Sequence, residues 1–311
     1  MLKIKKFKPK TPGTRFKIVL RNFRLRKKKI EKYLIMGLVK KGGRNNQGKI
    51  TVRHRGGGHK KKYRQILFKR SFLFDRFIFS DICLKITCVV VNFEYDPNRT
   101  AFLAKIYCIS THSYFYILAP KGLIIGDFIS FWGSGLFVPY EIKQQLSIGH
   151  SALLYNIPIG SLIHNVELKP RKGGQLVRTA GNFAQIMEKF DKVARVRLRS
   201  GEQRFILLTC SASLGMIDND DKRLTSKGKA GCNRWLGKRP HVRGTAMNPV
   251  DHPHGGGQGK TSGGRPSVTP KGRPTKGQPT RKRLLNKNIK LSVRLLKMLK
   301  KKSTRKGKFT Y

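Results

Sequence analysis

The sequence predicts an all-β protein, with two small barrels or sandwiches set between two long basic extensions of largely irregular structure. Three observations support this fold class. Short segments rich in β-branched and aromatic residues alternate with turn signals through the middle of the chain. Segments with helical periodicity are scarce. The excess positive charge lies almost entirely in the two flanks, which carry too little apolar surface to order by themselves.

The distribution of charge separates a body from its extensions. The 311 residues include 68 Lys and Arg against 15 Asp and Glu, a formal net charge of +53. Residues 1–70 hold 26 basic residues and one acid, Glu31, and residues 222–311 hold 26 and one acid, Asp251. The middle is nearly neutral and long enough to bury ordinary cores. A compact protein of this charge repels itself, so a polyanion, most often nucleic acid, is the expected partner.

Strand signals begin after the first extension. The predicted strands are Ile82–Tyr95, Ala101–Ser110, Tyr114–Leu118, Ala194–Arg199 and Gln203–Leu208. Turns separate them: Asp96–Arg99 contains a proline that fixes φ, and Ser200–Glu202 joins the last two strands. Such short, closely spaced strands favour small barrels or sandwiches over a βαβ sheet.

A domain boundary is predicted near Ile157–Ser161, where Pro158 and Gly160 follow the loop-like segment Gln144–Tyr155. The chain then divides into a basic arm over 1–70, β domains over 71–156 and 157–221, and a Gly/Pro-rich basic extension over 222–311. Within that extension, Asn288–Lys302 fits a basic helix, but its alternating apolar residues fit a strand equally well. The tail Lys297–Lys308 is either another arm facing RNA or a solvated run.

The cysteine pattern and the hydropathy of the chain argue against a disulfide-stabilised protein, a zinc ribbon and a membrane-spanning protein. The five cysteines are odd in number and contain no C-x-x-C pair, which argues against a disulfide framework and a zinc ribbon. We expect reduced, mostly packing residues; they are Cys83, Cys88, Cys108, Cys210 and Cys232. The longest apolar stretch, Tyr114–Tyr140, is interrupted by Pro120, Lys121 and Asp127, so we expect no membrane partner.

Two glycine-dense basic motifs, Gly43–Lys49 and Arg53–Lys62, lie in the first extension. Glycine lets the backbone approach a phosphate closely, and Arg and Lys supply charge-assisted hydrogen bonds. The alternative is a flexible, solvated tail. We favour RNA contact because such a tail has no need for the interleaved His, Asn and Tyr63.

The stretch His241–Gly264 permits several interpretations. Gly259–Thr261 resembles the end of a P-loop, but position 254 is His where that motif needs Gly. A metal site at Asp251, His252 and His254 lacks further ligands nearby in the sequence. A general-base role for His252 lacks an identified nucleophile. We favour a rigid loop, shaped by Pro and Gly, whose His, Asn and Arg side chains bind RNA.

The segments Gly231–Pro240 and Arg243–Gly257 resemble the bacterial-type family of the second protein of the large ribosomal subunit. The resemblance covers nearly the whole chain in order. Further segments that carry it are Lys10–Arg15, Gly43–Lys60, Glu94–Arg99, Ile117–Gly122, Ile157–Gly160, Ile163–Glu167, Gly173–Arg178 and Leu198–Glu202. The chain departs from the pattern at Lys271, where the family usually has Trp, in 71–82 and 128–156, and after Leu284, so contacts are not carried over there.

The resemblance implies an OB-fold barrel followed by an SH3-like barrel, with both termini extended into ribosomal RNA. It implies a structural protein and no enzyme, because RNA performs peptide-bond formation; His252 then resembles a positioning residue. The implied roles are binding of large-subunit ribosomal RNA, assembly, subunit association and support of the peptidyl-transferase region. Implied partners are that RNA, other ribosomal proteins and the small subunit across an intersubunit bridge. No cofactor is implied, apart from Mg²⁺ bound to the RNA nearby.

The RNA-binding residues are predicted from their side-chain chemistry together with the family resemblance. Arginines and lysines are expected on phosphates or in grooves, Asn and His on base edges or sugars, and Tyr63 and Trp235 on base faces, although Trp235 fits a core equally well. The predicted set is Arg44, Asn45, Arg53, Arg55, His59, Lys60, Arg178, Arg234, Trp235, Arg239, Arg243, Asn248, His252, His254 and Lys260.

The compartment of the protein is predicted from the position where the resemblance begins and from the composition of the chain. The match begins by about Lys8, which predicts no cleaved presequence. Richness in Phe, Ile and Lys, and the likeness of Gly259–Arg265 to alphaproteobacterial and mitochondrial members, predict an organelle-encoded protein of the mitochondrial ribosome in the matrix; a bacterial or plastid ribosome is the alternative.

Two other functions compete with the structural ribosomal one. They are a histone-like DNA condenser and an RNA-dependent enzyme using His252 and Asp251.

Overall fold

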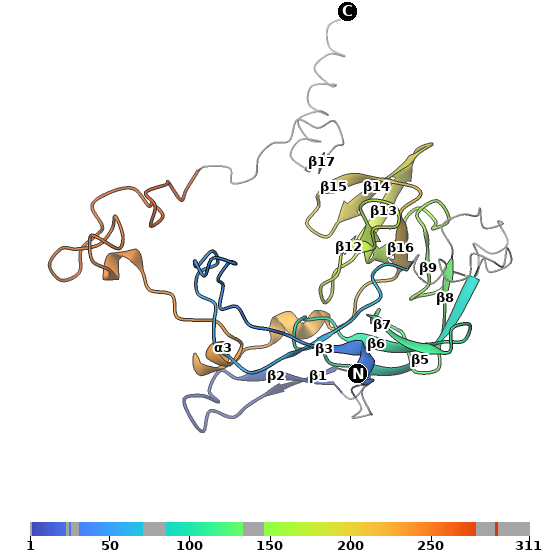
Figure 1. The fold of residues 1–311 in the computed structure, drawn as a ribbon, viewed down its shortest axis with the longest axis horizontal. Helices are drawn as coiled ribbons and strands as arrows, with labels where there is room; N and C mark the ends of the chain where they lie inside the picture. Colours follow the sequence, from blue (N-terminus) through green and yellow to red (C-terminus); the bar gives the residue numbers. More distant parts are fainter. Residues whose placement is uncertain are drawn as a thin grey trace, which may run out of the picture. The chain divides into compact units, whose positions relative to one another are not determined.

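The computed structural model describes residues 2–22, 25, 31–70, 85–132, 146–277 and 290–291 (Figure 1). The chain forms two compact units. Unit 1 comprises Met1–Leu38, Lys60–Gly228 and Asn288–Tyr311, and unit 2 comprises Val39–His59 and Lys229–Lys287. The two basic extensions therefore do not remain separate arms, since a segment of each joins the other in unit 2.

Unit 1 contains an antiparallel meander that forms the first core. Strand β5 (Lys85–Glu94) pairs with β6 (Leu103–Cys108) and β8 (Phe128–Trp132), and β6 pairs with β7 (Ser113–Leu118). Alternate residues of β5 are fully buried because successive side chains of a strand face opposite sides. They pack with Ile106, Ile129 and Phe131.

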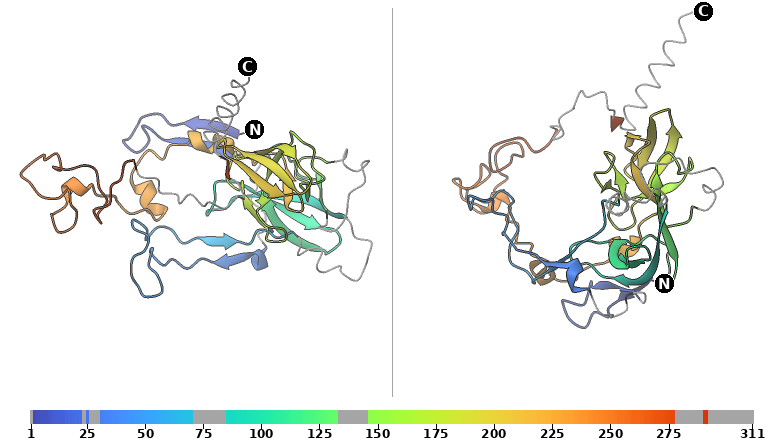
Figure 2. Two further views of the ribbon diagram at one scale, coloured as in Figure 1. Left: turned by 90° about the horizontal axis from the view of Figure 1, so that it is seen from above. Right: turned by 45° about the vertical axis from the view of Figure 1, so that its right-hand side comes forward.

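A second set of strands in unit 1 encloses a separate core. These are β9 (Ser151–Leu153), β10 (Leu162–His164), β13 (Ala184–Lys189), β14 (Val193–Leu198), β15 (Gln203–Leu207) and β16 (Ser211–Leu214). Their order is β15-β14-β13-β10-β16-β9, and one parallel bridge between β9 and β8 joins the two sets into one sheet. A small pair, β11 (Val166–Glu167) and β12 (Gly174–Leu176), lies beside them. Figure 2 shows the two sets as the green and yellow strands. The predicted all-β class is confirmed.

The prediction of a loop over Gln144–Tyr155 was wrong at residues 151–153, whereas its other described residues, 146–150 and 154–155, lie outside strands and helices. Residues 151–153 form β9, which pairs with β16, and Ala152 and Leu154 pack in the second core. The boundary predicted at Ile157 therefore falls inside that core, and we place the start of the second barrel before Ser151. A three-residue strand buried on every side has no alternation, so the sequence carries no signal for it.

The N-terminal extension is more ordered than predicted. Strands β1 (Leu2–Lys6) and β2 (Ile18–Asn22) form a hairpin, and β3 (Ile35–Gly37) pairs with β4 (Lys62–Arg64) after the short 3-10 helix η1 (Lys32–Leu34). A third cluster of apolar side chains explains the order of this second hairpin. Leu34, Ile66 and Phe68 pack there against Leu103 and Tyr116 of the first meander. Figure 2 shows β1 and β2 in blue.

A buried polar network joins the first and second cores. Arg70 donates to the Ser213 hydroxyl, and its guanidinium lies 5.1 Å from the centre of the Phe131 ring. Burial lowers the pKa of Arg70 to about 10, although Glu167 electrostatically favours its charge. His164 Nδ1 donates a 2.9 Å hydrogen bond to the Gly215 carbonyl, and burial, with Arg70 nearby, lowers its pKa to about 3.

The described cysteines of unit 1 were predicted correctly. Three cysteines, Cys88, Cys108 and Cys210, are free and buried, as expected of packing residues. Cys83 and the tail Lys297–Lys308 lie outside the described residues. Of the predicted helix or strand at Asn288–Lys302, only β17 (Lys290–Leu291) is described, and it pairs with β15. The short 3-10 helix η2 (Asp220–Leu224) lies near the end of the second segment of unit 1. No helix in the described ranges has the length and apolarity to cross a membrane.

Candidate nucleic-acid interface

Unit 2 is strongly basic and lacks a described apolar core. Its residues include 20 Lys and Arg and one acid, Asp251. The three clusters of buried apolar side chains found in the described residues all lie in unit 1. In the described part of unit 2 the helical elements are α3 (Gly231–Trp235) and the 3-10 turn η3 (Gly244–Ala246). Backbone hydrogen bonds and turns, instead of apolar packing, therefore hold this unit together.

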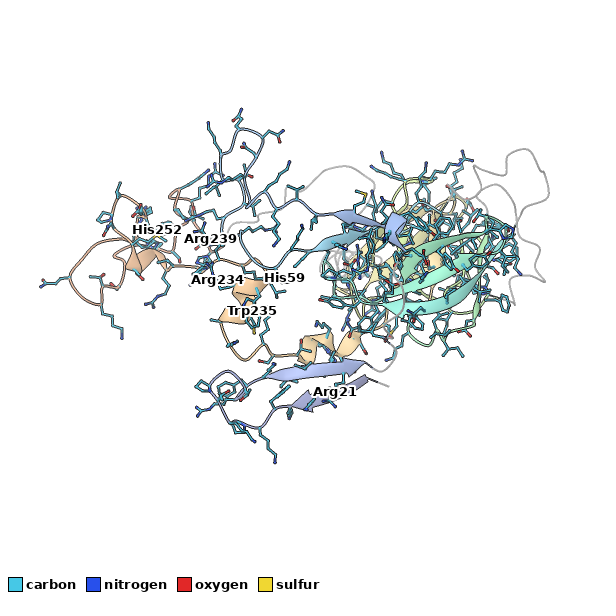
Figure 3. All side chains as sticks on the ribbon, turned by 60° about the horizontal axis from the view of Figure 1, so that its bottom comes forward. Arg21, His59, Arg234, Trp235, Arg239 and His252 are labelled. Atoms are coloured by element: carbon cyan, nitrogen blue, oxygen red, sulfur yellow. The ribbon has the colours of Figure 1, made fainter. Side chains whose placement is uncertain are left out.

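Residues 54–59 and 235–240 run beside each other and hydrogen-bond through their backbones. The amide of Gly56 donates to the carbonyl of Gly237 at 3.1 Å, that of His59 to Trp235 at 2.9 Å, and that of Arg239 to His54 at 3.1 Å. The His54 and His241 rings stack with centroids 4.1 Å apart. These contacts bring together basic residues that are far apart in the sequence (Figure 3).

Gly58 is required by this close approach. It has φ +81°, and a Cβ there would lie 2.5 Å from the Gly237 nitrogen and 2.7 Å from the Trp235 carbonyl oxygen. Backbone atoms cannot move aside as a flexible side chain can, so a larger residue would separate the two segments. Lys40 Nζ donates to the carbonyls of Gly58 and His59, both at 2.5 Å. The role of Lys40 could not be predicted from the sequence, because an isolated lysine in a basic segment gives no signal of such a role.

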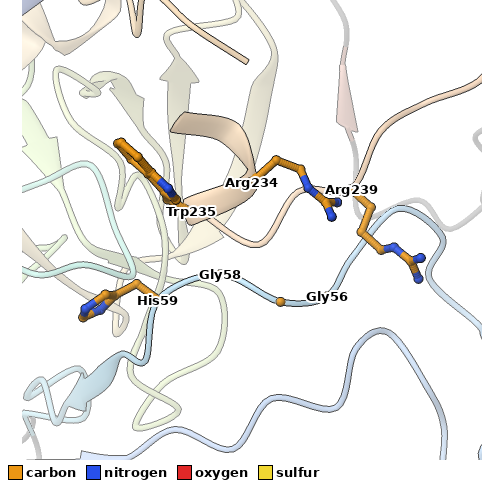
Figure 4. A pocket seen from close by; sticks show the side chains of 7 residues that line it. Gly56, Gly58, His59, Arg234, Trp235 and Arg239 are labelled. Atoms are coloured by element: carbon orange, nitrogen blue, oxygen red, sulfur yellow. The ribbon is translucent and has the colours of Figure 1, made fainter. Parts of the chain in front are cut away.

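The seven residues Gly56, Gly57, Gly58, His59, Arg234, Trp235 and Arg239 line a cavity of about 950 Å³ (Figure 4). The Trp235 side chain is 59% exposed, so it is not a core residue. Lys229 Nζ lies 4.8 Å from the Trp235 ring centre, a cation–π contact that the sequence did not predict. In the view of Figure 4, the guanidinium groups of Arg234 and Arg239 lie toward the same end of the cavity.

The first glycine motif of unit 2 is a self-supported turn. The Asn45 side-chain oxygen accepts the amides of Gln47 at 3.0 Å and Lys49 at 2.9 Å. The Arg44 guanidinium donates to the Gly48 carbonyl at 2.8 Å. Both residues were predicted to contact RNA. Their internal hydrogen bonds give them a second role, which is to hold the shape of the loop, while both side chains remain exposed.

His252 and His254 hold the second loop in a similar way. His252 is 7% exposed, and its Nδ1 accepts the amide of His254 at 3.0 Å. His254 Nε2 accepts the amide of Val268 at 3.0 Å. The amides of His252 and Asp251 both donate to the carbonyl of Asn248, at 3.2 and 3.0 Å. Among the described residues, no group of three or more His, Cys, Asp and Glu is arranged to hold a metal ion.

The structure divides the other predicted site residues between the two units. Arg53, Arg55, Arg243 and Lys260 belong to unit 2 and are exposed. Two predicted residues, Lys60 and Arg178, belong to unit 1. Arg178 packs over the Phe68 ring at 4.5 Å and donates to the Gly174 carbonyl at 3.2 Å, so it supports the fold of unit 1.

Comparisons with known proteins divide the chain differently, into two consecutive domains that each contribute residues to both units. The family model for "Ribosomal Proteins L2, RNA binding N-terminal domain" matches residues 31–131, and that for "Ribosomal Proteins L2, C-terminal domain" matches residues 147–272. The two matches are consistent with an OB-fold and an SH3-like barrel. The gap between them agrees with a second barrel that starts before Ser151.

Several curated bacterial proteins named "Large ribosomal subunit protein uL2" are similar over most of the chain. The protein from Brucella ovis is 50% identical over 278 residues, which are 89% of this chain and 93% of the relative. The one from Parvibaculum lavamentivorans is 49% identical over 89% of this chain and 92% of the relative. The one from Wolbachia pipientis subsp. Culex pipiens is 48% identical over 94% and 99%.

Proposed function

Because the chain belongs to the ribosomal protein L2 family, we propose that it is a structural constituent of the large ribosomal subunit that binds ribosomal RNA. The family consists of ribosomal proteins and is not an enzyme class. The observation that carries the proposal beyond the family is unit 2, in which 20 basic residues meet one acid and no described apolar core exists. Such a unit needs a polyanion to offset its self-repulsion.

RNA binding proceeds, in this proposal, through many phosphate contacts. The exposed side chains Arg53, Arg55, Arg239, Arg243 and Lys260 supply positive charge without an acidic partner nearby in the sequence. Binding releases counterions from the RNA, so affinity falls steeply as salt rises. Arg44 contributes charge from a turn whose shape it also fixes.

The loop around His252 positions RNA and performs no chemistry of its own. Its ring is buried and its Nδ1 already accepts an amide, which leaves that nitrogen unavailable as a general base. We propose, from the family resemblance, that this loop extends toward the peptidyl-transferase region. By the same reasoning the protein supports assembly and subunit association, with other ribosomal proteins and the small subunit as partners. We expect no cofactor beyond Mg²⁺ bound to the RNA.

The matching relatives are bacterial proteins. They favour a bacterial ribosome, which was the alternative to the predicted mitochondrial one. The mitochondrial ribosome stays a prediction from composition and from the Gly259–Arg265 segment. Organelle fractionation of the source cells, followed by mass spectrometry of the ribosomes, distinguishes these two compartments.

A competition measurement tests RNA binding against the DNA-condenser rival. The full chain is titrated with protein-free large-subunit ribosomal RNA and with duplex DNA of equal phosphate concentration, across a series of salt concentrations. We expect tighter binding to the RNA at every salt concentration. Arg239→Gln should reduce the slope of log affinity against log salt by about 1. Equal affinity for the two polymers would favour the condenser.

A further inference from the structure

We propose that the cavity of unit 2 binds a single unstacked RNA base, with Trp235 as the stacking surface and Arg234 and Arg239 on the adjoining phosphates. The proposal rests on the proposed RNA-binding function and names the chemical group that this site accepts. It is carried by the exposed indole, the paired guanidinium groups and the glycine wall of one cavity.

The exposure of Trp235 needs an explanation. It is the only Phe, Tyr or Trp in the sequence of unit 2, yet 59% of its side chain is exposed. An indole has a large apolar area, so leaving most of it in water forgoes the stabilisation that its burial would give. A flat ligand that covers the ring recovers this stabilisation, and a nucleobase is flat and presents a π face to stack on it.

The indole is also held in place before any ligand binds. The backbone carbonyl of Trp235 accepts a hydrogen bond from the amide of His59 at 2.9 Å, which fixes the backbone at the end of α3. Lys229 Nζ lies 4.8 Å from the ring centre and restrains it through a cation–π contact. A restrained aromatic ring loses little conformational entropy on binding, as expected of a stacking surface.

The rest of the cavity fits a nucleotide better than a duplex or an apolar peptide. Its volume of about 950 Å³ lies within the range of roughly 300–1,000 Å³ of small-ligand sites. One wall is the side-chain-free backbone of Gly56, Gly57 and Gly58, along which a sugar–phosphate can approach closely. Arg234 and Arg239 lie toward one end, and two guanidinium groups that share a space attract an anion such as a phosphate.

The test uses the full chain and two RNA hairpins. One hairpin carries a single bulged 2-aminopurine, and the other has the same stem fully paired. The salt concentration is chosen so that the paired hairpin binds weakly. We expect the wild-type chain to prefer the bulged hairpin and to quench 2-aminopurine fluorescence. Trp235→Ala should reduce this preference by about tenfold or more and abolish the quenching, and Trp235→Phe should restore part of both.

Trp132→Phe is the matched control, because that tryptophan lies in unit 1 and packs against its second core. It should leave the preference for the bulged hairpin unchanged. Hydrogen exchange at the His59 amide reports whether the Trp235 variants keep the backbone pairing of unit 2. If the wild type binds both hairpins equally, or Trp235→Ala keeps the preference with pairing intact, the base site is wrong while RNA binding stands. If the wild type binds neither hairpin nor ribosomal RNA, the proposed function itself fails.

Discussion

The amide of His59 donates a 2.9 Å hydrogen bond to the carbonyl oxygen of Trp235, although the two residues come from opposite basic extensions of the chain. This bond and its neighbours create the cavity that we assign to RNA. They also explain why Gly58 cannot be replaced by a larger residue. Both extensions therefore contribute to the candidate interface. A substitution in one extension should disturb the backbone hydrogen bonds that the other extension makes with it.

Gly58→Ala should break this pairing, whereas Gly57→Ala should leave it largely intact. Both glycines have positive φ, so alanine costs about 1 kcal/mol at each in backbone strain. Only at Gly58 would the Cβ also meet backbone atoms, at 2.5 Å; at Gly57 nothing lies within 4 Å. Hydrogen exchange at the His59 amide should accelerate by more than tenfold in Gly58→Ala relative to Gly57→Ala. Equal rates in the two variants would contradict the steric account.

His252→Ala should loosen its loop without preventing entry into the large subunit. The variant loses the acceptor of the His254 amide, a bond with a net contribution of about 1 kcal/mol. Exchange at that amide should rise about fivefold, and His252→Asn, which offers an oxygen in a similar place, should restore part of the protection. Val250→Ala, at a 91% exposed position of the same loop, is the control. Complete exclusion of His252→Ala from the subunit would refute the second half of the prediction.

Stability should fall on acidification through His164. Its pKa is lowered to about 3 in the folded chain by burial and by Arg70, against about 6.5 when unfolded. The unfolded chain thus binds the proton first, and stability is lost as pH falls below about 6.5. Between pH 7 and pH 4 the loss should be about 3 kcal/mol. The measurement is urea unfolding across this range, and His164→Gln should remove that part of the pH dependence; an unchanged profile would exclude His164 as its source.

Arg70→Met should destabilise unit 1 by about 3 kcal/mol, because it leaves the buried Glu167 carboxylate without a nearby positive charge and the buried Ser213 hydroxyl without its donor. Arg197→Met, at an exposed position of β14, should have little effect. Thermal unfolding of the full chain compares the two variants. A similar midpoint for both would show that the network adds little to stability.

The sequence predicted the parts of the fold that have strong local signals. Strands β5, β6, β7, β14 and β15 lie within one to three residues of the predicted segments, because each combines alternation with flanking turns. Strand β9 was missed because three buried residues give no period. The hairpin of β3 and β4 was missed because its order depends on distant apolar residues such as Tyr116.

The candidate site was predicted by residue type but not by arrangement. Charge and glycine content indicated Arg234, Arg239 and His59, and the structure places all three around one cavity with Trp235. The pairing of residues 54–59 with 235–240 is a long-range backbone contact without a local sequence pattern. For the same reason, the internal roles of Asn45 and His252 could not be separated from RNA contact by sequence alone.

The most direct test of the central claim is sedimentation of a native lysate through a density gradient, before and after a high-salt wash, with the protein followed by mass spectrometry. An integral component of the large subunit, held by many RNA contacts, should remain with that subunit through the wash. Release into the free fractions, or migration with DNA, would contradict the assignment of this chain as a structural ribosomal protein.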